Sequence, residues 1–154
     1  MLSELDASSY AGVQSLSLML AASAHNHDAF CSALPAFLAQ LDSTSLHTLT
    51  LGFSLFRPTH MYWTFVDWPA LDAALAALHA RSPATLVVVF RVAFVPAAGL
   101  AETLTADVAG PLIENLPGAL GAGTRIGVRC DLFDQMAGVA LRQGALRWLV
   151  SDGQ

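Results

Sequence analysis

Lysine is absent from the sequence, and all seven basic side chains are arginines. Charged residues make up only 12% of the 154 residues, and the formal net charge is −5 with a pI near 5.3. Because nucleic-acid binding relies on a basic surface, this acidic balance argues against a nucleic-acid partner. Cysteine is also scarce, since Cys31 and Cys130 are too few for a disulfide framework. We therefore expect an intracellular protein of the cytoplasm or nucleus.

Long apolar runs are missing as well. A membrane-spanning helix needs about 20 apolar residues, and the nearest approach, residues 86–98, is interrupted by Arg91. Residues 12–24 resemble the apolar part of a signal peptide, but Glu4 and Asp6 give the preceding segment the wrong charge. We expect no membrane partner.

Apolar residues, in contrast, are abundant, at 55% of the chain with a mean hydropathy of +0.54. This content provides enough apolar surface to offset the loss of chain entropy, which excludes intrinsic disorder. A chain of this length favours a single domain. We place that domain at residues 13–150, between short tails at residues 1–12 and 151–154.

Hydrophobic periodicity divides this domain into alternating strands and helices. Apolar–polar alternation predicts strands over residues 13–20, 46–53, 85–95, 125–132 and 146–150. Helical spacing predicts helices over residues 30–41, 71–78, 100–112 and 134–142. For the second helix, Asp67 marks the start, Pro69 falls in the first turn and Arg81-Ser82-Pro83 marks the end.

Strands that are separated by helices predict right-handed, parallel βαβ units. Strands of a sheet covered on both faces are continuously apolar, but only residues 85–95 have that character here. We therefore expect an α/β fold: an open, solenoid-like (leucine-rich-repeat-like), mostly parallel sheet of about five strands with helices on one face. The residues expected to be exposed together are Thr48, Thr50, Arg91 and Arg129, and those expected to be buried are Leu49, Leu51, Phe90 and Val128.

Several phrases of the sequence carry a family resemblance. Two predicted strands share the leucine-rich spacings Val13-x-x-Leu16-x-Leu18 and Leu46-x-x-Leu49-x-Leu51, which also fit a generic amphipathic strand. Further phrases are Leu55-Phe56-Arg57, Trp68-x-x-Leu71-Asp72, Pro83-Ala84-Thr85-Leu86 and Leu141-Arg142-Gln143-Gly144-Ala145-Leu146-Arg147. Over residues 13–150 this series resembles the C-terminal, leucine-rich-repeat-like half of the F-box-type proteins of mushroom-forming fungi.

The resemblance implies a role in protein recognition. In that family, the corresponding half recognises substrates of a cullin-type ubiquitin ligase, while an N-terminal F-box docks the adaptor. Residues 1–12 are too few for an F-box, and no Leu-Pro pair opens the chain. The ligase role is therefore not implied, and we expect a truncated paralogue or a partial gene model. The expected function is a non-enzymatic protein-interaction module with an unknown protein partner and no cofactor.

Two regions are candidates for the binding surface of such a module. The aromatic-rich connection 56–68 contains Arg57, Tyr62 and Trp63, and these residue types dominate interface hot spots. The exposed face of the predicted sheet is the second region. Its candidate residues are Ser17, Thr48, Thr50, Arg91, Arg129 and Asp131.

An alternative of a different class is a small metal-dependent hydrolase. His25, His27 and Asp28 could share a metal ion with Cys31, His47 or His60, because imidazole, carboxylate and thiolate are the usual ligands. The simpler interpretation is a polar loop in which Asn26 or Asp28 caps the following helix.

A phosphate-binding loop is excluded for the glycine-rich segment. Gly118-x-x-Gly121-x-Gly123 follows a predicted helix and precedes a predicted strand, which is the reverse of the order in phosphate-cradling loops. We interpret these glycines as a helix cap and a flexible connection.

Overall fold

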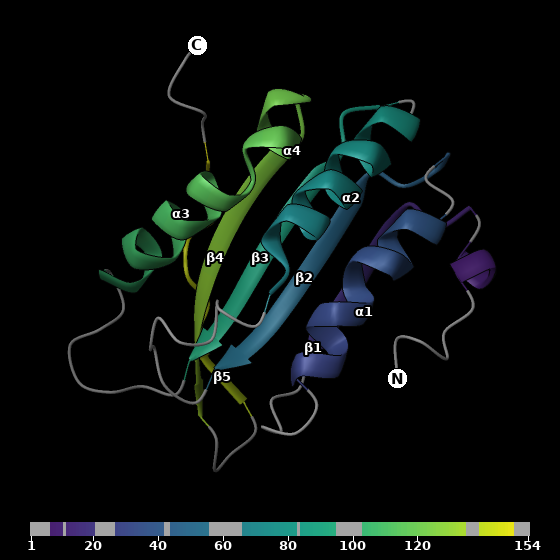
Figure 1. The fold of residues 1–154 in the computed structure, drawn as a ribbon. Helices are drawn as coiled ribbons and strands as arrows, with labels where there is room; N and C mark the ends of the chain where they lie inside the picture. Colours follow the sequence, from purple (N-terminus) through teal and green to yellow (C-terminus); the bar gives the residue numbers. More distant parts are fainter. Residues whose placement is uncertain are drawn as a thin grey trace.

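A layer of helices packs on one face of a single, mostly parallel sheet (Figure 1). This arrangement comes from a computed structural model, which describes residues 7–10, 12–20, 27–41, 44–55, 66–82, 84–94, 103–134 and 139–149. The strands are β1 (Ser15–Leu20), β2 (Thr48–Leu55), β3 (Val87–Phe94), β4 (Arg125–Asp134), β5 (Val139–Arg142) and β6 (Arg147–Trp148). The helices are α1 (His27–Gln40), α2 (Trp68–Arg81), α3 (Thr103–Asn115) and α4 (Pro117–Gly121), preceded by a 3-10 turn, η2 (Ala7–Tyr10).

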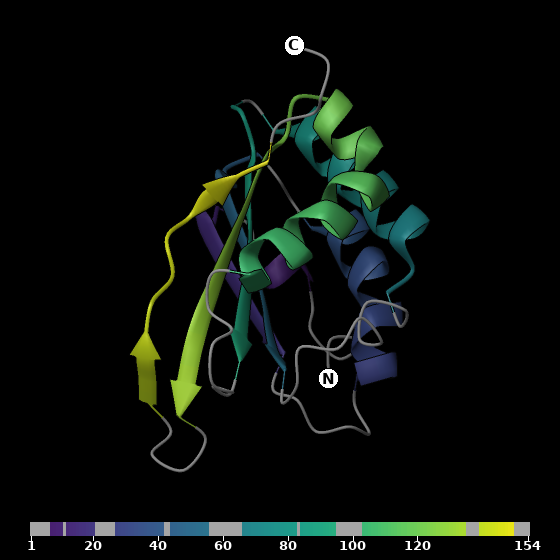
Figure 2. The ribbon, with the colours of Figure 1, turned by 90° about the vertical axis from the view of Figure 1, so that its left-hand side faces the viewer.

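The strands follow one another across the sheet in the order of the chain. β1, β2, β3 and β4 are parallel neighbours, and β5 and β6 both pair with β4 in the antiparallel direction. The side view in Figure 2 shows the helices on one side of this sheet. The predicted α/β fold with an open, mostly parallel sheet and helices on one face is therefore confirmed.

The register aligns one apolar residue from each parallel strand in a row across the sheet. Leu16, Leu49, Val88 and Ile126 are neighbours in this row, at intervals of 33, 39 and 38 residues along the chain. All of them are buried beneath the helices. The four residues predicted to be buried, Leu49, Leu51, Phe90 and Val128, are buried as expected.

The core between the sheet and the helices is almost entirely aliphatic. Phe53 and Phe90 add one stacked aromatic pair, with ring centroids 6.4 Å apart. The helices contribute leucines above all, and the fully buried ones are Leu34, Leu38, Leu71, Leu75, Leu78 and Leu112. Burial of this much apolar surface is the main stabilising contribution to the fold.

Helix α2 begins and ends where the sequence predicts. The side chain of Asp67 caps the helix by accepting a hydrogen bond from the backbone N–H of Ala70 at 3.1 Å. At the other end, Arg81 Nη2 donates to the carbonyl oxygen of Leu38 at 3.2 Å, which joins α2 to α1. Among the described helices, none has both the length and the apolar content needed to cross a bilayer.

Two predictions about the second half of the chain are wrong. The predicted helix over residues 134–142 does not form, because β4 continues to Asp134 and Val139–Arg142 is the strand β5. The physical reason is that β4 would otherwise present a row of unpaired backbone groups, which β5 satisfies. The glycine-rich segment is also more ordered than predicted, since Pro117–Gly121 forms the short helix α4.

Helix α4 is held by a side chain from another helix. The carboxylate of Asp72 in α2 accepts hydrogen bonds from the backbone N–H groups of Gly118 (2.9 Å) and Ala119 (2.7 Å). A Cβ atom at Gly118 would lie 2.7 Å from Asp72 Oδ2, so this close approach requires glycine. Asp72 therefore fixes the connection between α3 and β4 by satisfying the exposed donors at the start of α4.

The last strand is shorter than predicted. β6 contains only Arg147 and Trp148, and Leu149 is the buried residue of this segment. Leu146 and Trp148 lie together, as alternation predicts, but they are 41% and 39% exposed. Trp148 pairs with Gly127, which places it on the sheet face opposite to the helices.

Candidate functional site

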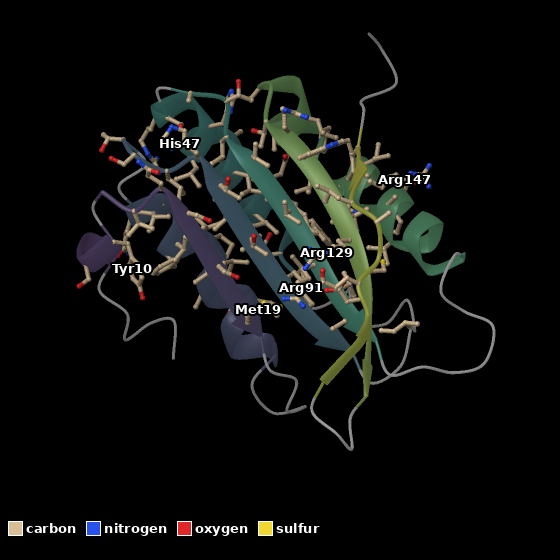
Figure 3. The ribbon with its side chains drawn as sticks, turned by 180° about the vertical axis from the view of Figure 1, so that it is seen from behind. Tyr10, Met19, His47, Arg91, Arg129 and Arg147 are labelled. Atoms are coloured by element: carbon tan, nitrogen blue, oxygen red, sulfur yellow. The ribbon has the colours of Figure 1, made fainter. Side chains whose placement is uncertain are left out.

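The sheet face opposite to the helices, called the open face below, carries no described helix (Figure 3). Its side chains come from alternate residues of the four parallel strands and form three rows in register. From β1 to β4 the rows are Ser15, Thr48, Val87 and Arg125; Ser17, Thr50, Val89 and Gly127; and Met19, Gly52, Arg91 and Arg129.

The two halves of the open face have different chemistry. The β1–β2 half carries the hydroxyl side chains of Ser15, Ser17, Thr48 and Thr50, and the β3–β4 half carries Arg91, Arg125 and Arg129. Met19 is 50% exposed, and its thioether lies over Gly52, where a Cβ atom would collide with it. The face therefore carries hydroxyl groups on one side and arginines on the other.

Arg91 and Arg129 share one buried carboxylate, that of Asp131 in β4. Arg91 Nε donates to Asp131 Oδ2 at 2.5 Å, and Arg129 Nη2 donates to the same oxygen at 3.3 Å. Arg129 Nε lies 3.1 Å from Asp131 Oδ1, close enough for an ion pair, but it lacks the geometry of a hydrogen bond. The arginine side chains are 30% and 29% exposed, whereas that of Asp131 is 2% exposed.

The segment that joins β5 to β6 covers the other side of Asp131. The backbone N–H of Gly144 donates to Asp131 Oδ1 at 3.1 Å. A Cβ atom at position 144 would collide with the carbonyl oxygen of Cys130, so only glycine permits this close approach. Both carboxylate oxygens of Asp131 thus have hydrogen-bond partners, as a buried charge requires.

This arrangement corrects the expectation that Asp131 is available to a partner. Asp131 lies on the open face, but its carboxylate is buried beneath Arg91 and Arg129. Because they compensate the charge of Asp131, they support the sheet as well as forming part of its surface.

A second cluster lies around Trp148, nearer the start of β4. The guanidinium carbon of Arg125 is 4.4 Å from the centroid of the Trp148 ring, which is a cation–π contact. A Cβ atom at Gly127 would lie 2.9 Å from Leu146 Cδ1 and 3.1 Å from Trp148 Cε3. The absence of a side chain at Gly127 therefore lets Leu146 and Trp148 lie on the open face.

The other predicted binding residues divide into two groups. Ser17 is exposed and Thr48 and Thr50 are half-buried, and all three lie on the open face near one another. Arg57, Tyr62 and Trp63 lie outside the described residues. The structure therefore brings together the sheet part of the predicted surface.

The residues of the alternative metal site are largely outside the described part of the chain. This applies to His25 and His60, and to the side chains of His27 and Asp28, whose backbone begins α1. His47 is exposed just before β2. Within the ranges that the structure describes, no group of three or more His, Cys, Asp or Glu side chains is arranged to hold a metal ion.

Sequence reasoning missed Arg125, Leu146 and Trp148 as members of the open face. The signal for Arg125 was present, because Arg125, Gly127 and Arg129 alternate along one strand and must point to one side. The position of Trp148 had no such signal, since it depends on the pairing of β6 with Gly127, which is distant in the sequence.

Comparison with known proteins gives no relative for this chain: no family model, no curated protein and no solved structure matches it. The resemblance to F-box-type proteins therefore stays a prediction.

Proposed function

We propose that this chain is a non-enzymatic protein-interaction module that binds its partner through the open face. The role is similar to that of the substrate-recognition half of an F-box-type protein. As in a solenoid, the continuous exposed face of the sheet would contact the partner. The observation that carries the proposal is the arginine pair of the uncovered face, which Asp131 holds in a fixed orientation.

Three features of the open face support binding. Its backbone is fixed by strand pairing, so a partner would meet a surface that needs little ordering. Its side chains include the half-buried Arg91 and Arg129 and the exposed Trp148, and arginine and tryptophan are enriched in interface hot spots. Among the described residues, the large apolar side chains that are exposed, Met19, Leu146 and Trp148, all lie on this face.

Site-specific photo-crosslinking tests this proposal. A benzophenone amino acid is introduced at Ser17, an exposed position of the open face, and at Ala77, an exposed position of α2 in the helix layer. After irradiation in a lysate of the source cells, we expect a discrete protein adduct from the Ser17 variant and none from the Ala77 variant. Adducts from Ala77 alone would contradict the proposal.

Metal analysis of the purified chain tests the alternative hydrolase. The interaction module predicts no stoichiometric transition metal and no effect of a chelator on thermal unfolding. About one transition-metal ion per chain, together with destabilisation by the chelator, would instead favour a metal centre at His25, His27 and Asp28.

A further inference from the structure

The open face is basic although the chain as a whole is acidic. Arg91, Arg125 and Arg129 account for three of the seven arginines, and Asp131 is the one acidic side chain among the described residues of this face. The net charge of the chain is −5. With three arginines against one described carboxylate, the β3–β4 half of the open face is the part of this surface that attracts a negatively charged ligand.

Among the described residues, some of the arginine donors have no hydrogen-bond partner. Arg91 contacts Asp131 through Nε, and Arg129 contacts it through Nε and Nη2. Arg91 Nη1 and Nη2, and Arg129 Nη1, make no hydrogen bond to any described residue. A guanidinium group that is held by one edge presents its remaining N–H groups in a fixed direction, which suits a second carboxylate.

The spacing along β4 sets the spacing of the ligand. Arg125, Gly127 and Arg129 point to the same side, and a rise of about 3.3 Å per residue separates the two arginines by ~13 Å along the strand. Between them, Gly127 leaves room for Leu146 and Trp148, which form an exposed apolar patch. The order along the strand is therefore basic, apolar, basic.

We infer that the β4 side of the open face binds an acidic segment of a partner protein in an extended conformation. Its two carboxylates would be four residues apart, with an apolar side chain midway. In an extended chain, the side chains at positions i, i+2 and i+4 point to one side, with the same rise per residue as β4. The two carboxylates would therefore reach Arg125 and the Arg91–Arg129 pair, and the apolar side chain midway would reach the Leu146–Trp148 patch. This inference rests on the proposed function and names the chemistry of its partner.

Fluorescence anisotropy with a synthetic peptide tests the inference. The probe is a short fluorescein-labelled peptide that has two aspartates four residues apart, a leucine midway and serines elsewhere. One control peptide has asparagines in place of the aspartates, and a second has the two aspartates adjacent, which keeps the charge but changes the spacing. We expect saturable binding of the probe only, weakened by added salt because the contacts are partly exposed ion pairs.

Three variants locate the binding on the protein. Arg125→Gln and Trp148→Ala should each weaken probe binding at least about fivefold, as expected for hot-spot positions. Arg147→Gln is the matched control, because Arg147 is also exposed and carries the same charge. Arg147 pairs with Val128, whose side chain is in the core, so Arg147 does not belong to the rows of the open face. In Figure 3 it lies at the sheet edge, away from Arg91 and Arg129. The affinity of this variant for the probe should change less than about twofold. Circular dichroism confirms that each variant is folded.

Specific outcomes would overturn the inference. If the peptide with adjacent aspartates binds as tightly as the probe, the four-residue spacing of the carboxylates is not required. If Arg147→Gln weakens probe binding as much as Arg125→Gln does, the binding site is not on the open face. A single-stranded oligonucleotide that displaces the probe and binds more tightly would favour a nucleic-acid ligand instead. If no acidic peptide binds while Ser17 still gives a protein adduct, this inference fails and the proposed function stands. Failure of both experiments removes the proposed function as well.

Discussion

The two faces of the sheet are made by the same four strands, but their side chains follow different rules. On the helix-covered face, the rows that begin at Leu16 and Leu18 consist of large apolar residues that are all buried, such as Leu49, Val88 and Phe90. On the open face, the rows contain hydroxyl groups, glycines and arginines. Packing density constrains the first face. Because the open face lacks this constraint, its arginines and exposed apolar side chains point to a role in binding.

Two glycines also contribute to the distinct character of the open face. Gly52 and Gly127 both belong to the open face, and each lies beneath a long side chain from a neighbouring strand, Met19 and Trp148 respectively. A side chain at either glycine would displace that neighbour. The surface of the open face is therefore formed partly by side chains that reach across from adjacent strands, which a single strand cannot reveal.

The largest expected effect is the loss of packing on the covered face. Phe90→Ala removes a fully buried ring that stacks on Phe53, and we expect the free energy of unfolding to fall by about 3–5 kcal/mol. Val89→Ala, one residue along β3 and half-buried on the open face, should lower it by about 1 kcal/mol or less. Urea denaturation measures both, and equal losses would contradict the assignment of the two faces.

The second effect concerns Asp131, the buried charge among the described residues of the open face. Asp131→Asn should lower the free energy of unfolding by about 2 kcal/mol, because it removes both ion pairs and leaves two adjacent guanidinium groups. The value is below that of a fully buried pair because both arginines reach solvent. Thermal unfolding at low and high salt measures it. A variant as stable as the original chain would show that the carboxylate does not hold the arginines.

A smaller effect is expected at the helix layer, outside the core itself. Asp72→Ala should cost about 1 kcal/mol, since the first N–H groups of α4 lose their acceptor. Hydrogen exchange at Gly118 and Ala119 should accelerate at the same time. Unchanged exchange at these two amides would mean that α4 does not depend on Asp72.

The smallest effects separate the arginines of the open face from one another. Arg91→Ala should cost about 1 kcal/mol, because Asp131 keeps only one of its two cationic partners. Arg125→Ala removes an exposed side chain that contacts the Trp148 ring, and its effect should stay within about 0.5 kcal/mol. Differential scanning calorimetry resolves the two variants, and the opposite ranking would contradict the structural role of Arg91.

The covered face and the order of the elements from β1 to α3 could be predicted from the sequence, because alternation and helical spacing are local signals. The start of α2 is an example, since Asp67 and Pro69 act within one turn. β5 and α4 could not be predicted, because each depends on a partner distant in the chain: the edge of β4 for β5, and Asp72 for α4.

The candidate site was predictable only in part, for the same reason. Alternation placed Arg91, Arg129 and Asp131 on one face, but it could not show that Asp131 lies beneath the two arginines. That burial requires Gly144, thirteen residues further along, to donate its N–H to the carboxylate. The depth of a side chain below a sheet surface is a tertiary property.

The central claim is that the open face, and not the helix layer, binds ligands. Two-dimensional NMR of side-chain N–H groups tests it directly during titration with the two-aspartate peptide. We predict shifts in the Nε–H signals of Arg91, Arg125 and Arg129 and in the indole N–H of Trp148. The Nε–H signal of Arg81, at the end of α2, should not move. Shifts at Arg81 with unchanged signals from the open face would contradict the claim.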